Sequence, residues 1–67
     1  MLFRLERQLL LSALARVTAQ YRQVLELYEL EGRDYRAIAS ALDLQVGTVR
    51  SRLHRARREL RSILVER

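Results

Sequence analysis

The chain has 67 residues, of which 49% are apolar and 31% charged, and its formal net charge is +5. It contains no cysteine, which excludes disulfides and thiolate metal sites, and no stretch near the roughly 20 apolar residues that cross a bilayer. We therefore expect one small domain over residues 1–67, without a cofactor and without a membrane partner. A single histidine and the lack of a glycine-rich phosphate loop argue against an enzyme.

The first predicted helix covers residues 2–15 and carries more leucine than one buried stripe requires. Charged residues interrupt this segment from Arg4 onward, which argues against a signal peptide and favours a cytoplasmic location. Its apolar side chains point in several directions around the helix, with Leu11 apart from the others. The surplus predicts either a helix that fills a groove in the core or a surface for a partner, including weak self-association through residues 2–14.

The second predicted helix follows Thr18 and runs to about Glu31. Thr18 is a suitable N-cap residue, because its hydroxyl can accept a hydrogen bond from the first turn. The apolar residues that follow recur at the i, i+3, i+4 and i+7 spacing of a helix packed on one side. Gly32 is expected to end this helix in the left-handed conformation that glycine adopts readily.

A short third helix is predicted from Tyr35 to Leu42, with Asp34 as its N-cap. Asp43 falls where the chain must turn, and aspartate tolerates the left-handed region better than most residues. A fourth helix then runs from about residue 46 to residue 65. The fold class expected from this order is all-α, a small four-helix domain with a helix-turn-helix at about residues 34–58 and a long C-terminal recognition helix.

The surplus positive charge lies entirely in the last predicted helix. Residues 1–49 hold six arginines and six acidic residues, whereas residues 50–67 hold seven arginines against Glu59 and Glu66. At about 100° per residue, one side of this helix is aliphatic and is expected to be buried. The aliphatic set is Val46, Val49, Leu53, Ala56, Leu60, Ile63 and Leu64.

The opposite side of the last helix suits duplex DNA. Gly47 and Thr48 lie at the helix N-terminus, where free N–H groups can bind a phosphate. Ser51, His54 and the arginines follow where base edges would lie, and arginine can bond guanine bidentately. The polar set is Gly47, Thr48, Ser51, His54, Arg55, Arg58 and Arg61, with Arg50 and Arg57 on one flank. Tyr35 and Arg36, at the start of the preceding helix, are expected near phosphates.

Two stretches, residues 34–39 and residues 46–57, together resemble region 4 of bacterial sigma factors, and within it the extracytoplasmic-function group. The run Gly-Thr-Val-Arg-Ser-Arg-Leu-His-Arg-Ala-Arg, residues 47–57, carries most of the similarity, which extends over about residues 14–64. The resemblance implies a domain that reads the −35 element of double-stranded promoter DNA with the second helix of a helix-turn-helix. It also implies docking on the β flap of the RNA polymerase core, and masking by an anti-sigma factor.

Position by position, the resemblance assigns base recognition to four residues of the last helix and backbone contacts to two others. The recognition set is Arg50, Ser51, His54 and Arg55, and the backbone set is Thr48 and Tyr35. The chain departs from the usual pattern at Gln45, where serine is common and caps better. It also carries Arg36 in a region where an acidic residue is common. The positive charge of Arg36 favours contact with a phosphate.

Other interpretations of the sequence remain open at this point. The effector domain of a response regulator shares the helix-turn-helix, although the dense arginines after Leu53 fit it poorly. A protein-interaction module would use the leucine-rich first helix to bind polymerase, an anti-sigma factor or a second copy. The sequence also fits either a fragment of a longer sigma factor or a free-standing regulator that resembles region 4.

Overall fold

The computed structural model describes the backbone of residues 2–66 and the side chains of residues 6–66. Within that range all regular secondary structure is helical, with no strand. The elements are α1 (Leu2–Ala15), α2 (Ala19–Leu25), which continues directly into the π-helical segment η1 (Glu26–Leu30), α3 (Tyr35–Leu42) and α4 (Val46–Val65). The expected all-α, four-helix arrangement is confirmed. The side chains of residues 2–5, which begin the leucine-rich first helix, lie outside the described residues.

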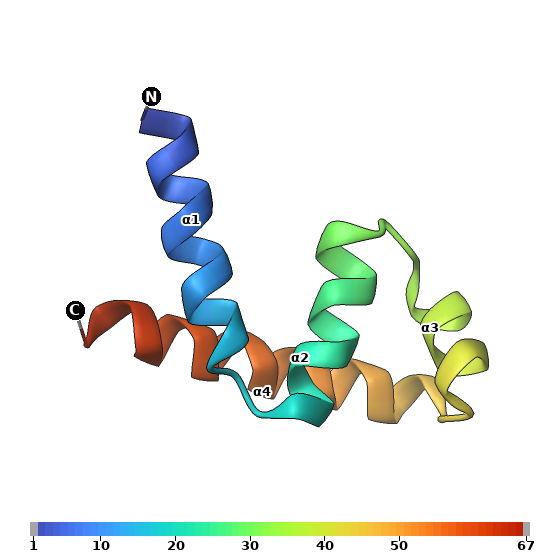
Figure 1. The fold of residues 1–67 in the computed structure, drawn as a ribbon. Helices are drawn as coiled ribbons and strands as arrows, with labels where there is room; N and C mark the ends of the chain where they lie inside the picture. Colours follow the sequence, from blue (N-terminus) through green and yellow to red (C-terminus); the bar gives the residue numbers. More distant parts are fainter. Residues whose placement is uncertain (1, 67) are drawn as a thin grey trace.

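The long helix α4 supports all the other elements (Figure 1). α3 lies beside its N-terminal part, α2 crosses its middle, and α1 touches it near the C-terminal end and then leaves at a steep angle (Figure 1). The ion pair between Arg16 and Glu66, 3.6 Å, joins the end of α1 to the end of α4. As a result, α1 and α3 flank opposite ends of one rod.

The core forms where α2, α3 and α4 meet. Its largest fully buried side chains are Val24 of α2, Ile38 of α3, and Val49 and Leu53 of α4. Burial of side chains of this size is the main favourable contribution to folding. On α4 the predicted stripe is largely confirmed, because Val49, Leu53, Ala56 and Ile63 are buried and Val46 and Leu60 are half-buried.

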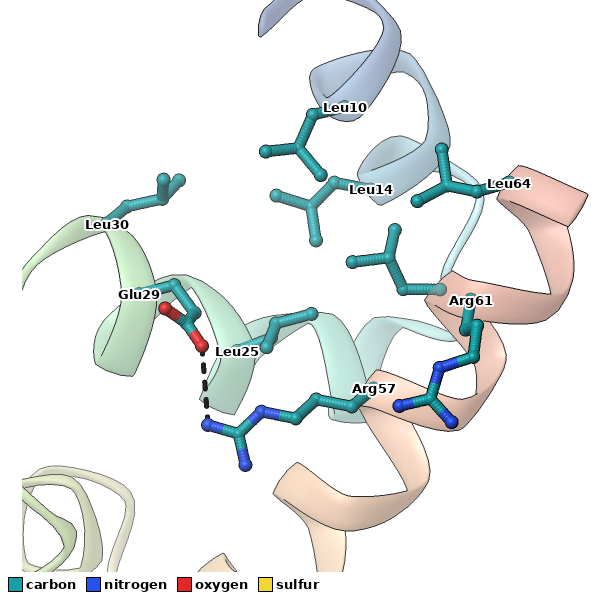
Figure 2. A pocket seen from close by; sticks show the side chains of 9 residues that line it. Leu10, Leu14, Leu25, Glu29, Leu30, Arg57, Arg61 and Leu64 are labelled. Atoms are coloured by element: carbon teal, nitrogen blue, oxygen red, sulfur yellow. Dashed lines mark hydrogen bonds and ion pairs between the residues drawn. The ribbon is translucent and has the colours of Figure 1, made fainter. Parts of the chain in front are cut away.

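Leu64 is the member of that stripe for which the prediction is wrong. Its side chain is 36% exposed. The helical periodicity directs Leu64 toward the bundle, where it lines a groove with Leu10 and Leu14 of α1 (Figure 2), but α1 does not close over it. The periodicity of a helix gives the direction of a side chain, whereas coverage depends on the neighbouring helix.

The turn between α3 and α4 has the geometry that the sequence predicts. Asp34 caps α3, since its Oδ1 accepts a hydrogen bond from the Ala37 N–H at 2.8 Å. Asp43 adopts the left-handed conformation, with φ 57° and ψ 49°. Just beyond it, the Leu44 N–H donates to the Ala39 carbonyl at 2.8 Å, which closes the C-terminus of α3 as in a Schellman motif. This turn fixes the direction in which α4 begins.

The second helix differs from its prediction at both ends. The Thr18 side chain makes no capping bond to α2 and instead donates to Glu59 Oε2 of α4 at 3.1 Å. The C-terminal part widens into the π-helical η1, where the Glu31 N–H donates to the Glu26 carbonyl at 3.1 Å. Gly32 then ends the segment with φ 68°, as expected. Sequence periodicity alone does not reveal such a widened turn.

Candidate nucleic-acid interface

The candidate DNA-contacting residues lie on the solvent side of α4, opposite its buried stripe. Every residue of this set is exposed except Thr48, which is half-buried. The set is Gly47, Thr48, Arg50, Ser51, His54, Arg55 and Arg58. Because Ser51, His54, Arg55 and Arg58 have the spacing i, i+3, i+4 and i+7, they share one face of the helix. The structure therefore places these side chains together and leaves them free of the core.

The N-terminus of α4 is open, as the weak capping residue suggests. Gln45 makes no side-chain capping bond, and the first intrahelical bonds run from the N–H groups of Thr48 and Val49 to the Gln45 carbonyl, at 3.0 and 3.1 Å. A Cβ added at Gly47 would meet nothing within 4 Å in the structure. Packing within the chain thus gives no reason for glycine at this position, and the surface there is accessible to a large partner.

On α3, Arg36 is exposed and Tyr35 is half-buried at the first helical position. The Tyr35 ring meets Arg50 of α4, whose guanidinium carbon lies 5.8 Å from the ring centroid. Arg50 lies on the flank of the recognition face, as its angular position on the helix predicts. Its contact with Tyr35 joins the two helices of the helix-turn-helix at the edge of the candidate interface.

The charges of α4 divide into exposed arginines and arginines held within the fold. The ion pairs found among the described residues use Arg16, Arg33 and Arg57, none of which belongs to the candidate set. Arg57 donates to Glu29 Oε2 at 3.3 Å and lies over the Tyr28 ring. Burial lowers the pKa of Arg57, but interactions with Glu29 and Tyr35 outweigh burial and leave the pKa raised overall. Arg57 is therefore a structural cation.

Glu59 is one of the two acidic residues of the basic C-terminal segment, and the sequence does not reveal its partner. The Glu59 carboxylate accepts hydrogen bonds from the backbone N–H and the hydroxyl of Thr18, 41 residues earlier in the chain. No pattern in the sequence indicates a contact at this separation. The Glu59 carboxylate thereby connects α4 to the residue that precedes α2, and the Glu59 side chain also lies beside Arg55 and Arg58.

A second feature is an apolar groove between α1, the α2–η1 segment and α4 (Figure 2). Its volume is about 390 Å³, and leucines from three elements form most of its lining. The lining residues are Leu10, Leu14, Leu25, Glu29, Leu30, Arg57, Leu60, Arg61 and Leu64. In Figure 2 the Glu29–Arg57 pair closes one side, and Arg61 lies on the same helix one turn further along. The surplus leucine of residues 2–15 was the signal for this groove.

The fold and the exposed basic helix define a helix-turn-helix DNA-binding domain. The chain matches the family model described as sigma-70, region 4, over residues 7–60, and it belongs to that family. Region 4 is a non-enzymatic domain of sigma factors that binds the −35 promoter element. None of the helices described here is long and apolar enough to cross a membrane.

Curated relatives agree with this assignment. The chain is 39% identical over 55 residues to the ECF RNA polymerase sigma factor SigE of Mycolicibacterium smegmatis, covering 82% of this chain and 21% of that protein. It is 42% identical over 62 residues to SigL of Mycobacterium tuberculosis, covering 92% and 35%. The ECF RNA polymerase sigma-E factor of Escherichia coli is 41% identical over 51 residues, covering 76% and 27%. The chain thus spans about a fifth to a third of these relatives.

Proposed function

We propose that this chain recognises the −35 element of promoter duplex DNA by placing the N-terminal half of α4 in the major groove, and that it does so attached to RNA polymerase during transcription initiation. The observation that carries the proposal is the exposed polar face of α4. Ser51, His54, Arg55 and Arg58 share that face, and the turn at Asp43 orients the helix that presents them. The fold thus provides a complete helix-turn-helix reader.

Different residues perform different parts of this recognition. Arg50, Ser51, His54 and Arg55 read base edges, and arginine in particular discriminates guanine through two parallel hydrogen bonds. The backbone N–H of Gly47, together with the side chains of Thr48, Arg36 and Arg58, binds phosphates and fixes the register without sequence information. Because a single module buries a small interface, isolated binding is weak and depends steeply on salt.

The proposal can be tested with a DNA duplex selected for binding to this chain. Repeated selection from a randomised duplex library should enrich one motif, and fluorescence anisotropy should show tighter binding to it than to a scrambled duplex. The logarithm of the affinity should fall linearly with the logarithm of salt concentration, by roughly 0.9 for each phosphate neutralised. Failure to enrich a motif, or an affinity that does not change with salt, would contradict this function.

Replacing Arg55 by alanine is the sharpest single change within that experiment. Loss of a bidentate base contact should weaken binding to the selected duplex by about 1–3 kcal/mol and relax preference at one base pair. Arg61→Ala is the control, because it removes the same charge from α4 at a residue that lines the apolar groove. If both variants lost affinity equally on every duplex, Arg55 would be a phosphate contact only.

The apolar groove supports the attachment to polymerase. Leu10, Leu30 and Leu64 line it while remaining exposed, and exposed leucines gathered in one concave surface indicate a protein partner. We assign the groove to a helix of the polymerase β flap, which would bury these leucines. An anti-sigma factor or a second copy of the chain would compete for the same surface, and the cytoplasm is the compartment where all these partners meet promoter DNA.

A further inference from the structure

Four side chains from three elements form an alternating series of guanidinium groups and aromatic rings. The Tyr28 ring of η1 lies against the Tyr35 ring of α3, with centroids 5.5 Å apart and planes inclined by 52°. Arg57 covers Tyr28 with its guanidinium carbon 5.2 Å from the centroid, and Arg50 covers Tyr35 at 5.8 Å. We call this series, Arg57–Tyr28–Tyr35–Arg50, the tyrosine–arginine ladder.

The inner end of the ladder is held firmly. Arg57 is half-buried and donates to Glu29 Oε2 at 3.3 Å, so its guanidinium is fixed between η1 and α4. Because the Tyr28 ring, which Arg57 covers, lies against the Tyr35 ring, the fixed guanidinium supports both rings. Tyr28 and Tyr35 are consequently held by groups that belong to the fold.

Tyr35 itself occupies a constrained position in the backbone. It is the first residue of α3, directly after the Asp34 cap, and its side chain is half-buried. The outer end of the ladder is different, because Arg50 is exposed and takes part in none of the ion pairs found among the described residues. A long exposed arginine normally samples many rotamers, and it loses that freedom when it binds a base.

We propose that Tyr35 is a positioning residue for Arg50: its ring holds the guanidinium at the edge of the recognition face before DNA arrives. This proposal rests on the proposed function, in which Arg50 reads a base edge. An exposed cation–π contact is modest, and we expect it to contribute roughly two- to five-fold in affinity. The contribution should be confined to sequences with the base pair that Arg50 recognises, so Tyr35 affects specificity without touching a base.

The competing role for Tyr35 is a hydroxyl contact to a phosphate, which the sequence predicts. The two roles use different parts of the side chain, the ring in one case and the hydroxyl in the other. Tyr35→Phe removes only the hydroxyl, whereas Tyr35→Leu removes the ring that faces Arg50 and leaves an apolar residue in place.

A double-mutant cycle on the selected duplex tests the proposal. Tyr35→Phe should bind within two-fold of the parent chain, while Tyr35→Leu should lose roughly two- to five-fold. In an Arg50→Ala background Tyr35→Leu should have no further effect, because its target is gone. Arg55→Ala is the matched control, because Arg55 lies on the same helix but is not part of the ladder. In the Arg55→Ala background, Tyr35→Leu should therefore keep its full effect on affinity.

A measurement on the free parent chain avoids any dependence on how the variants fold. The NMR signals of the Arg50 side chain should be displaced upfield relative to those of Arg55, because the Tyr35 ring current acts on Arg50 alone. Equal shifts for the two arginines would overturn the proposal. So would an undiminished effect of Tyr35→Leu in the Arg50→Ala background, or a loss with Tyr35→Phe as large as that with Tyr35→Leu.

Failure of the proposed function gives a different result. In that case the parent chain would bind the selected and scrambled duplexes equally, and no double-mutant cycle could be measured. An upfield shift of Arg50 accompanied by sequence-specific binding and a coupling restricted to Arg50 would support both proposals together.

Discussion

Glu59 and Thr18 illustrate what a single contact contributes to this domain. The Glu59 carboxylate accepts both the backbone N–H and the hydroxyl of Thr18, immediately before α2 begins. A carboxylate at that position also interacts favourably with the N-terminal end of the helix dipole. The contact therefore ties the start of α2 to α4.

Replacing Glu59 by alanine should move stability and DNA affinity in opposite directions. Loss of the two hydrogen bonds should lower the free energy of unfolding by about 1 kcal/mol. The increase of one unit in net positive charge should strengthen binding to any duplex at low salt. Thermal unfolding followed by circular dichroism and anisotropy titration measure the two effects.

The control for this change is Thr18→Ala, which removes only the hydroxyl donor. It should lower stability without altering DNA affinity, since the Glu59 charge remains. A Glu59→Ala variant with unchanged melting temperature would show that the pairing with Thr18 is not a significant contact in solution.

At the residue scale the sequence predicted contacts within a few residues and missed those between distant ones. The Asp34 cap and the left-handed Asp43 were correct because residue type and immediate neighbours determine them. The predicted Thr18 cap was wrong because Glu59, far along the chain, competes for the hydroxyl. The roles of the nine candidate DNA-binding residues stay predictions, because no DNA is present to test them.

At the scale of elements, helix bounds followed directly from the sequence, while the interior of α2–η1 did not. α3 and α4 have the predicted ranges, since caps, turn residues and apolar periodicity agree there. The π-helical η1 arises from one widened hydrogen-bonded turn, and its residues would suit an ordinary helix equally well. Only the three-dimensional structure shows that η1 contributes Tyr28 to the ladder and Glu29 to the groove.

The depth of burial along α4 also gives a prediction at this scale. Leu53 is 0% exposed and Leu64 is 36% exposed, although both belong to the same aliphatic stripe. Leu53→Ala should reduce the free energy of unfolding by about 2–5 kcal/mol, because it leaves a cavity in the core. Leu64→Ala should reduce it by less than about 1 kcal/mol. Equal losses in chemical denaturation would mean that α1 closes over Leu64 in solution.

At the scale of the whole molecule, two candidate surfaces occupy different parts of the bundle. The exposed face with Ser51, His54, Arg55 and Arg58 lies on the solvent side of α4, and the apolar groove lies between α1, the α2–η1 segment and the C-terminal half of α4 (Figure 2). The sequence predicted the first surface from charge and left the second as an alternative role for the leucine-rich helix. The angle at which α1 leaves α4 opens the groove, and no local pattern encodes that angle.

The two surfaces should be separable by mutation. Leu10→Asp places a charge in the groove and should weaken binding to the polymerase β flap at least ten-fold, while affinity for the selected duplex stays unchanged. Leu11→Asp is the control, because Leu11 is exposed to a similar extent, 46% against 42%, and does not line the groove. Loss of flap binding by both variants in a pull-down with purified flap would instead indicate a binding surface that covers the whole of α1.

The unbroken course of α4 has a consequence for how promoter and enzyme are aligned. One helix carries Ser51, which is proposed to contact a base, and the groove residue Leu64, about 20 Å apart along its axis. Each residue inserted between them would turn one end by about 100° and advance it by about 1.5 Å relative to the other. Under the proposed function, the angular phase between the bound DNA and the polymerase is therefore set by the length of one continuous helix.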